Sequence, residues 1–472
     1  PFKVNLVSTG VLPWMSNEIV AVPVPVSVNA TAGTAKLVFN GTASDAMHLK
    51  DLSGRFTLSG SSLADAGKPF GVTLPTTGAF RTAGIAVKQG PTWRVLVEDA
   101  TVGSSKLNGA FTYESSRAVP LLIGKLGGSR LLLSDLGPAI GAAPASTTNT
   151  ASDAGNLKKT SAPGKVLPDR KFELASLRVM DANVIFDVAE VDLNTTLLEP
   201  FRPLHGHIQL FDGVLKLTDI SASTAQGTLT GAWVLDGRGN TGLWNADMRW
   251  ENVQLDRWLH QKRAKDAAPP FISGSLRGSA KVRGQGQSTA EILATLKGRV
   301  FSELEDGEMS HLIIELAGLD IAQGLGLLFK GDEQLPVDCA VTELVAENGV
   351  FQSRVTVIDT PDSTLFVDGT ISLGAEALDL RAVVTPKDFS PLTLRTPLQV
   401  RGTFGNPQVA VDKGALTRKV GSAVLLGLLN PLAALIPLAD RGDKATARKR
   451  ASGCEALARR GSERLKAPVR IK

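Results

Sequence analysis

Histidine, the commonest metal ligand and acid–base side chain, is scarce in this chain and badly spaced for either use. Among five histidines only His205 and His207 lie close together, two positions apart, so they would share one face of a strand. Even a catalytic zinc site takes three protein ligands, and no third candidate lies near this pair. The pair therefore indicates a structural or solvated role, and the sequence predicts no metal site.

A glycine pattern also has an ordinary explanation. Gly237, Gly239 and Gly242 have the GxGxxG spacing of dinucleotide-binding loops. Such a loop must lead from a strand into a helix, because the helix N-terminus then faces the phosphates. Here the glycines separate two strand-like runs, 232–235 and 242–250, so they predict a hairpin.

Three aspartates, Asp359, Asp362 and Asp368, could be imagined as calcium ligands. Their spacing does not fit the twelve-residue calcium loop, and aspartate is common in turns. The sequence also lacks a nucleophile elbow, a P-loop and a recognisable pair of catalytic carboxylates. An enzyme is therefore not expected, and no cofactor is predicted.

The two cysteines offer one piece of covalent chemistry. Cys339 precedes a strand-like run, and Cys454 lies in the basic C-terminal part of the chain. In an oxidising compartment two cysteines suggest one disulfide, which would fasten the C-terminal part to the sheet. The alternative is two unrelated thiols.

The elements that would hold these residues are mostly β-strands. Many glycines and prolines with only 5% aromatic residues are typical of short strands and turns, and apolar residues repeat with the period of two of a half-buried strand. Pro23 and Pro25 remove backbone donors, which predicts an edge strand there. The apolar stripes comprise Val22, Val24, Val26, Val95, Val97, Val184, Phe186, Leu378, Leu380 and Val384.

Three stretches repeat one plan: an acidic turn, a small polar run, a short alternating strand and a glycine. They are Asp99–Gly109, Asp219–Gly231 and Asp359–Gly369. Internal repeats of this kind favour an elongated array over a compact globule. We therefore expect a mainly β fold, an elongated and curled antiparallel sheet enclosing a groove, with a few short helices and a C-terminal helical segment.

Helices are expected at few places. Ser288 and Glu291 form a capping box, which predicts a short helix to about Lys297. Helices are also predicted within Val253–Arg263 and, from apolar residues at helical spacing, within Ser310–Phe329. The expected units are two β repeat regions, 1–141 and 172–265, joined by a flexible linker at 142–171, then a β domain with short helices at 266–412 and a C-terminal segment at 413–472.

The C-terminal segment combines an apolar run with a basic tail. Val420–Ala439 has no charged side chain over 20 residues, long enough to span a membrane. Asn430 and Pro431 interrupt it, which favours two short helices, buried or lying in a membrane interface. From Lys413 onward fourteen Lys and Arg stand against four acids. This basic tail suits an anionic lipid surface, and nucleic acid is not expected because no aromatic residues are interleaved with it.

Four short motifs, in this order, resemble the AsmA family of Gram-negative envelope proteins. They are Ile123–Gly141 (IGKLGGSRLLLSDLGPAIG), Cys339–Leu344 (CAVTEL), Asp359–Asp362 (DTPD) and Gly402–Pro407 (GTFGNP). The resemblance covers most of the chain and is strongest over 271–412.

The resemblance implies an N-terminal inner-membrane helix followed by a long periplasmic β region, similar in architecture to the eukaryotic bridge-like lipid-transfer proteins. This chain starts at Pro1 and lacks that helix, so we expect it to be a fragment of a protein anchored in the inner membrane. The family also implies work on outer-membrane assembly, with outer-membrane assembly components as candidate partners, and carriage of phospholipid by its larger members.

Two hypotheses follow. In the first, the apolar stripes line a trough that shelters or conducts phospholipid acyl chains, which needs no catalytic residue. In the second, the chain is a non-catalytic scaffold that affects the targeting of outer-membrane proteins through its partners, and each stripe is ordinary core against a helix. A continuous apolar lining favours the first hypothesis, and an interior filled by side chains favours the second.

Overall fold

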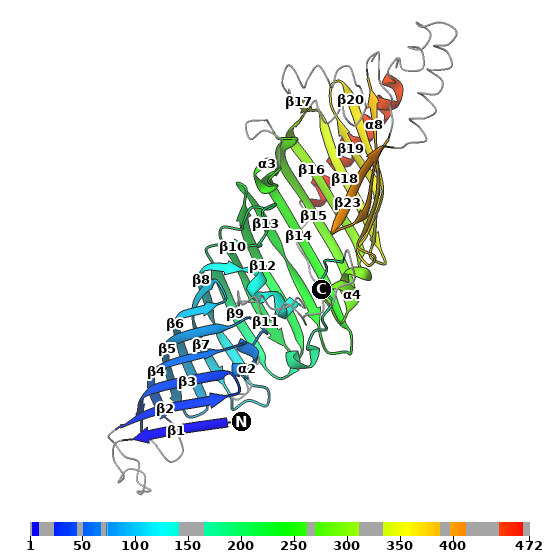
Figure 1. Ribbon diagram of the computed structural model, residues 1–472. Coiled ribbons are helices and arrows are strands. Elements are labelled where there is room, and N and C mark those ends of the chain that lie inside the picture. Colours follow the sequence, from blue (N-terminus) through cyan, green and yellow to red (C-terminus); the bar gives the residue numbers. More distant parts are fainter. Residues whose placement is uncertain are drawn as a thin grey trace, which may run out of the picture.

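The computed structural model describes residues 2–8, 23–44, 51–67, 72, 74–140, 165–261, 270–310, 334–387, 397–411 and 443–465. These residues form one sheet of 23 strands (Figure 1). The strands lie side by side from the N-terminal end to the C-terminal end, so the sheet is a long ribbon whose strands cross its width. The expectation of a mainly β, elongated sheet with few short helices is confirmed.

The first part of the sheet contains β1 (Phe2–Ser8), β2 (Val24–Ala32), β3 (Ala35–Ala43), β4 (Asp51–Gly60), β5 (Phe80–Gln89), β6 (Thr92–Val102), β7 (Ser105–Glu114) and β8 (Leu121–Leu132). The second part contains β9 (Asp181–Val188), β10 (Val191–Asp192), β11 (Leu204–Phe211), β12 (Val214–Thr224), β13 (Gly227–Asp236), β14 (Gly242–Gln254), β15 (Ile272–Gly286), β16 (Lys297–Ser310), β17 (Gln334–Val337), β18 (Cys339–Glu347), β19 (Val350–Asp359), β20 (Ser363–Ser372), β21 (Ala377–Pro386), β22 (Leu398–Thr403) and β23 (Asn406–Val411).

The sheet is an antiparallel meander with one parallel step. β9 and β10 both pair with β8 in parallel, so β8 and β9 begin at the same long edge of the sheet. The sheet is therefore mixed, with the expected antiparallel pairing everywhere else among its described strands. The expected units 1–141 and 172–265 are joined in one sheet, because β8 of the first pairs with β9 of the second.

Both long edges of the ribbon carry short helices. The first rim, which holds the β6–β7 turn, has α2 (Leu63–Gly67), the 3-10 helix η2 (Leu133–Ile140) and α3 (Leu255–Trp258). The second rim, which holds the β5–β6 turn, has the 3-10 helix η3 (Leu174–Arg178) and α4 (Thr289–Ala294). The capping box of α4 is confirmed, since Ser288 Oγ accepts from Glu291 N at 3.2 Å. This helix ends before Lys297, and the helix expected within Val253–Arg263 is only the single turn α3.

A rim segment, residues 165–173, runs along the second rim beside hairpins far from it in sequence. The backbone N–H groups of Val166 and Leu167 donate to the carboxylate of Glu376 in the β20–β21 turn. Glu376 is only 2% exposed. Further along, Ala290 N donates to Pro168 O at 2.9 Å, at the start of α4. The segment therefore ties the C-terminal hairpins to the start of β9.

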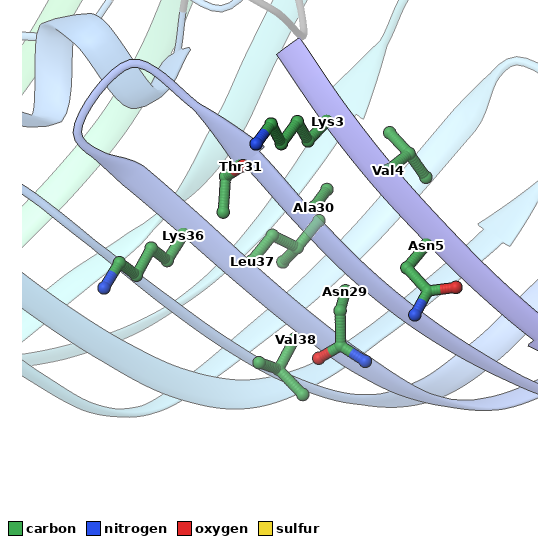
Figure 2. Close-up of a pocket in the computed structure, with 9 residues that line it drawn as sticks. All are labelled: Lys3, Val4, Asn5, Asn29, Ala30, Thr31, Lys36, Leu37 and Val38. Atoms are coloured by element: carbon green, nitrogen blue, oxygen red, sulfur yellow. The ribbon is translucent and has the colours of Figure 1, made fainter. Parts of the chain in front are cut away.

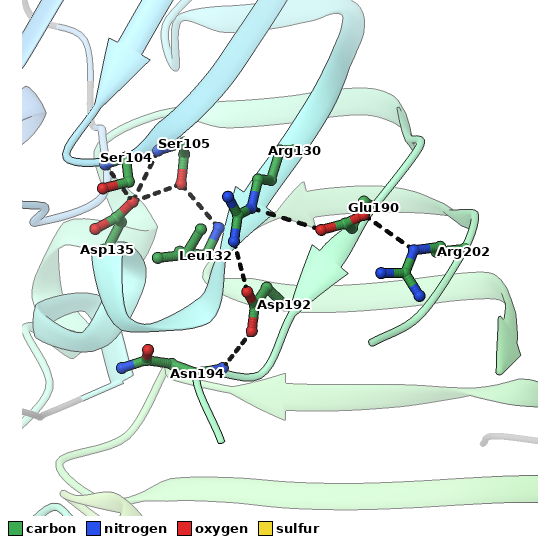
Figure 3. Close-up of polar contacts among 9 residues, drawn as sticks. All are labelled: Ser104, Ser105, Arg130, Leu132, Asp135, Glu190, Asp192, Asn194 and Arg202. Atoms are coloured by element: carbon green, nitrogen blue, oxygen red, sulfur yellow. Dashed lines mark hydrogen bonds and ion pairs between the residues drawn. The ribbon is translucent and has the colours of Figure 1, made fainter. Parts of the chain in front are cut away.

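The parallel step is surrounded by polar contacts (Figure 3). Arg130 donates to Asp192 at 2.8 Å and lies 3.5 Å from Glu190, which also accepts from Arg202 at 2.9 Å. The hydrogen bond from Arg130, with one from Asn194 N, lowers the pKa of Asp192 below its ordinary value of 3.8. These charges join β8 to the first residues of the second part.

The 3-10 helix η2, which follows β8, is hydrogen-bonded to the β6–β7 turn through Asp135. Asp135 is buried and accepts from the N–H groups of Ser104 and Ser105 at 2.9 Å and from Ser105 Oγ at 2.7 Å (Figure 3). Three hydrogen bonds to one carboxylate satisfy its burial. The acidic residue of the motif IGKLGGSRLLLSDLGPAIG therefore has a structural role.

The C-terminal helix α8 (Lys444–Leu465) lies on the outside of the sheet and is covalently joined to it. Cys339 and Cys454 form a disulfide with an S–S distance of 2.02 Å, so the predicted bridge is confirmed. Around it Cys454 packs with Phe301, Val341 and Val357.

Two expectations about strands need correction. β2 pairs with both β1 and β3, so Pro25 is not in an edge strand. It is tolerated because β1 ends at Ser8, opposite Val26, so no residue of β1 pairs with Pro25. The Ser8 hydroxyl donates to Pro25 O at 3.2 Å.

The three repeats are hairpins of the first rim, but the acid opens the turn only in the third. Asp99 and Asp219 stand at β-bulges inside β6 and β12, where the strand register shifts. A bulge needs an irregular backbone, and Asp219 adopts a φ of 53°. Asp99 and Asp219 therefore lie at bulges within strands and not in turns.

Candidate functional site

Nine of the ten predicted groove residues lie on the same face of the sheet, and Val22 lies outside the described residues. In an antiparallel pair, directly opposed residues share a face, so the register can be followed across the sheet. Val28 opposes Phe39, Phe39 opposes Phe56, and Phe56 opposes Gly84, which opposes Val97. The same procedure places the following residues on this one face, here named the apolar face: Val24, Val26, Val95, Val97, Val184, Phe186, Leu378, Leu380 and Val384.

Part of the apolar face is only half-buried, although its side chains on β9, such as Val184 and Phe186, are buried. Its large side chains include Phe56, Val95 and Phe111, and later Leu344 and Leu380, all of which keep part of their surface accessible. Where a second layer covers a sheet, such residues are almost fully buried. Apolar residues on an uncovered, curled sheet have the intermediate exposure seen here. Much of the apolar face is therefore left without a second covering layer among the described residues.

Short helices pack against the sheet at both rims. Ala66 of α2 packs against Phe80 and Val102 at the first rim. Leu177, in η3, packs near Tyr113 and Leu210 at the second rim. Of the predicted set, Val24 and Val184 are buried, whereas Val97 and Leu378 are half-buried.

The sheet curls most strongly near the C-terminal end. Met309 of β16 and Val384 of β21 belong to one cluster, although three strands separate β16 from β21 in the sheet. Side chains on non-neighbouring strands can meet only if the apolar face is concave there. The curl expected from the sequence is therefore present in this part.

The opposite face, here named the polar face, has a different chemistry. Arg55 and Glu98 form an ion pair on it at 2.8 Å. Next to β1 it carries a shallow pocket of about 720 Å³, whose polar and apolar lining residues come from three neighbouring strands (Figure 2). Two rows of these residues point to the polar face. The rows are Lys3–Thr31–Lys36 and Asn5–Asn29–Val38. This depression is on the outside of the sheet and is not part of the groove.

The residues that resembled catalytic or metal sites have structural partners. His207 Nε2 lies 2.6 Å from Asn183 Oδ1, and His205 Nδ1 lies 3.2 Å from Asp187. No group of metal-binding side chains is assembled anywhere in the described part of the chain. The GxGxxG glycines form the turn between β13 and β14, as predicted.

The DTPD motif closes the β19–β20 hairpin. Asp359, buried in this turn, accepts from Thr364 Oγ1 at 2.6 Å and from Lys387 Nζ at 3.0 Å. Thr360 Oγ1 donates to Ser363 O at 3.0 Å. A buried carboxylate with charged and neutral donors is satisfied without a ligand.

Sequence reasoning missed a group of hydroxyl side chains within the apolar face: Ser302, Thr342, Ser353 and Thr356. They stand on β16, β18 and β19, where the usual order of apolar inside and polar outside is reversed. The adjacent residues Phe301, Val341 and Val357 point to the polar face and lie under α8. Three short reversals were visible in the sequence, but only the strand register shows that they are neighbours.

In the part of the chain that the structure covers, no helix is both long and apolar enough to cross a membrane. The predicted apolar segment Val420–Ala439 and nearly all of Ser310–Phe329 lie outside that part.

Comparison with known proteins agrees with this architecture. The model of the AsmA family matches residues 20–356. The chain belongs to the AsmA family. It is 32% identical over 425 residues to the AsmA family protein YhjG of Escherichia coli strain K12, covering 88% of this chain and 61% of that relative. The chain thus spans less than two thirds of the relative's length. No solved structure matches it.

Proposed function

We propose that this AsmA-family chain shelters or conducts phospholipid acyl chains along its apolar face and so supports assembly of the bacterial outer membrane. The observation that carries the proposal is one apolar face, continuous in register from β1 to β23, on which residues such as Val95, Val97 and Leu380 are only half-buried. Acyl chains gain about 0.8 kcal/mol for each methylene removed from water. A groove that offers such a surface can hold lipid without any catalytic residue.

The backbone supports the same role. Among the described strands each is hydrogen-bonded to its neighbours in the sheet, so most of their N–H and C=O groups are already paired where an acyl chain would lie. An apolar guest therefore meets side chains whose polar backbone groups are already satisfied. The polar face, with its ion pairs, keeps the outside of the ribbon in contact with water.

The proposed location is the periplasm, with the whole protein anchored to the inner membrane. The Cys339–Cys454 disulfide supports it, because disulfides persist in oxidising compartments such as the periplasm. Membership of a family of envelope proteins supports it as well. Phospholipid is the proposed cargo, and components of outer-membrane assembly are the proposed protein partners.

A second candidate is a non-catalytic envelope scaffold that affects the targeting of outer-membrane proteins. The observation in its favour is the polar face, where the pocket beside Lys3 and Lys36 and the helix α8 offer surface for partners. In that case the apolar face would be covered in the cell by protein rather than by lipid.

The test is mass spectrometry of lipid that co-purifies with the protein from a Gram-negative periplasm. Two substitutions place a charge in the groove, Val184→Asp and Val95→Asp. Two matched controls place the same charge one residue away on the polar face, Ile185→Asp and Leu96→Asp, where the side chains are 49% and 46% exposed. Val95 is half-buried, so its variant keeps the experiment informative if Val184→Asp does not fold.

The lipid-sheltering function predicts stoichiometric phospholipid in the wild type and in both controls, and much less in the folded groove variants. A folded wild-type protein that is free of lipid, even after incubation with liposomes, would refute this function and favour the scaffold.

A further inference from the structure

The hydroxyl row, which comprises Ser302, Thr342, Ser353 and Thr356, crosses the apolar face on adjacent strands. Gly278 opposes Ser302, Ser302 opposes Thr342, and Thr342 opposes Thr356. Ser353 lies next to this line, opposite Leu344. Opposed residues on neighbouring strands are about 5 Å apart, so the hydroxyl groups form a polar band across an otherwise apolar lining.

The reversed pattern has an explanation on the outside but not on the inside. On the polar face Phe301, Val341 and Val357 are apolar because α8 covers them, and all three are at most 4% exposed. Nothing in that contact requires hydroxyl groups on the other side, where valine or alanine would continue the apolar lining. The hydroxyl groups are half-buried and face the groove.

The hydrogen bonds within the hydroxyl row leave one donor and one acceptor unused at its β16 end. Ser353 Oγ donates to Val367 O at 3.1 Å, and since a hydroxyl has one proton, Thr356 donates to Ser353 at 3.0 Å and Thr342 donates to Thr356. Thr342 thus keeps free acceptor capacity. Ser302 Oγ has no hydrogen-bond partner among the described residues, so the row ends in a free donor beside a free acceptor.

A tryptophan ring covers the strand next to this end. Gly278, opposite Ser302, has no side chain, and the indole ring of Trp250 lies over it, because a Cβ at Gly278 would lie 2.6 Å from two ring atoms. The Trp250 N–H is buried and lacks an acceptor in the described part of the chain. This buried indole N–H lies beside the hydroxyl row and is not one of its accessible donors.

Charge is absent from this part of the groove. Following the register from β14 to β23, the apolar-face positions of these strands are occupied by apolar, glycine or hydroxyl residues among those described. A phosphate or other ion would lose its hydration there without a counter-charge. Neutral hydroxyl groups suit neutral acceptors and donors instead, such as ester carbonyl and glycerol oxygens.

We propose that the hydroxyl row binds the uncharged ester and glycerol region of a diacyl lipid whose acyl chains lie along the apolar lining beside it. The proposal rests on the proposed lipid-sheltering function and adds a fixed position for the cargo. The hydroxyl row then binds the lipid at one defined position. The rest of the apolar face contacts acyl chains without favouring any position along them. The charged headgroup lies outside the row, toward the open side of the groove.

The experiment uses the full chain and a phosphatidylethanolamine with a photoreactive diazirine either next to the ester or at the methyl end of one acyl chain. After irradiation, peptides that carry lipid are identified by mass spectrometry. The test variant is Ser302→Ala/Thr342→Val, which removes the free end of the row with little change in shape. The matched control is Ser279→Ala/Thr370→Val, the same chemistry on the polar face of nearby strands.

The ester-proximal probe should label β16, β18 and β19 preferentially, and the methyl-end probe should label other strands. Loss of one neutral hydrogen bond changes a population about fivefold, so the test variant should lose at least that enrichment, whereas total bound lipid and the control stay within about twofold. Bound lipid with equal labelling by both probes along the groove would overturn the hydroxyl row and leave the lipid function intact. No bound lipid at all would overturn both.

Discussion

Replacement by alanine should affect the stability of α8 differently at its two glycines, Gly453 and Gly461. Gly461 is buried, and a Cβ there would overlap the ring of Phe301. That ring is 4% exposed and is held by Val341 and Val357, so it cannot move away freely. Gly453, in the same helix, is exposed and has open space around its Cα. Gly461→Ala therefore tests the packing of α8 on the sheet, and Gly453→Ala is its matched control.

The magnitudes follow from two terms. Replacing glycine by alanine inside a helix stabilises it by about 1 kcal/mol, and this gain is common to both variants. Overpacking a buried contact costs about 1–3 kcal/mol, and this loss applies only to Gly461→Ala. The two variants should therefore differ by about 1–3 kcal/mol in the free energy of opening of α8.

Hydrogen exchange of peptides from the last turns of α8 measures this opening directly. Gly461→Ala should lower protection there by about fivefold to a hundredfold relative to Gly453→Ala, since 1.4 kcal/mol is a factor of ten. Because Gly461 lies beyond Cys454, the disulfide does not hold these turns in place. Equal protection in the two variants would refute the packing of α8 against Phe301.

Three further predictions concern the connections that hold the ribbon together. Reducing the Cys339–Cys454 disulfide, or replacing both residues by serine, should lower the free energy of unfolding of the part that joins β18 to α8. The loss is about 5 kcal/mol in the chain-entropy model, because the bridge closes a separation of 115 residues. A urea midpoint unchanged by reductant would contradict this. Glu376→Ala should cost about 1–3 kcal/mol by leaving the N–H groups of Val166 and Leu167 unpaired. It should also speed proteolysis of 165–173, and a cleavage rate equal to wild type would argue against this tie. Because the folded-state pKa of Asp192 is lowered, its contribution to stability is present at neutral pH and is lost as the pH falls from about 3.8 through the folded pKa. Melting temperatures of Asp192→Asn and wild type should therefore differ at pH 7 and converge under strong acid, and a constant difference would exclude this linkage.

The strands and their apolar sides could be predicted because their signal is local. Asn183 and Asp187 alternate with Val184 and Phe186, and this alternation alone locates β9 and its apolar side. The capping box before α4 and the glycine turn between β13 and β14 are equally local. Where a prediction depended on neighbours in space, as for Pro25, the sequence could not reveal that β1 ends at that position.

The parallel step, the rim segment and the hydroxyl row depend on contacts between distant residues. Ser302 and Thr356 are 54 positions apart, and only the pairing of β16, β18 and β19 brings them into one line. The helix α8 did carry a signal that was missed. Ala447, Cys454 and Gly461 recur every seventh position, the spacing of one helical face, and all three are buried against the sheet.

The most direct test of the central claim places a photoreactive amino acid at Val95, Leu96, Val184 or Ile185 in the protein in living Gram-negative cells. Each pair of neighbours samples the two faces of one strand. The account predicts phospholipid adducts at Val95 and Val184 and little at Leu96 and Ile185. Equal adducts on both faces, or none at Val95 and Val184, would contradict a lipid-bearing apolar face.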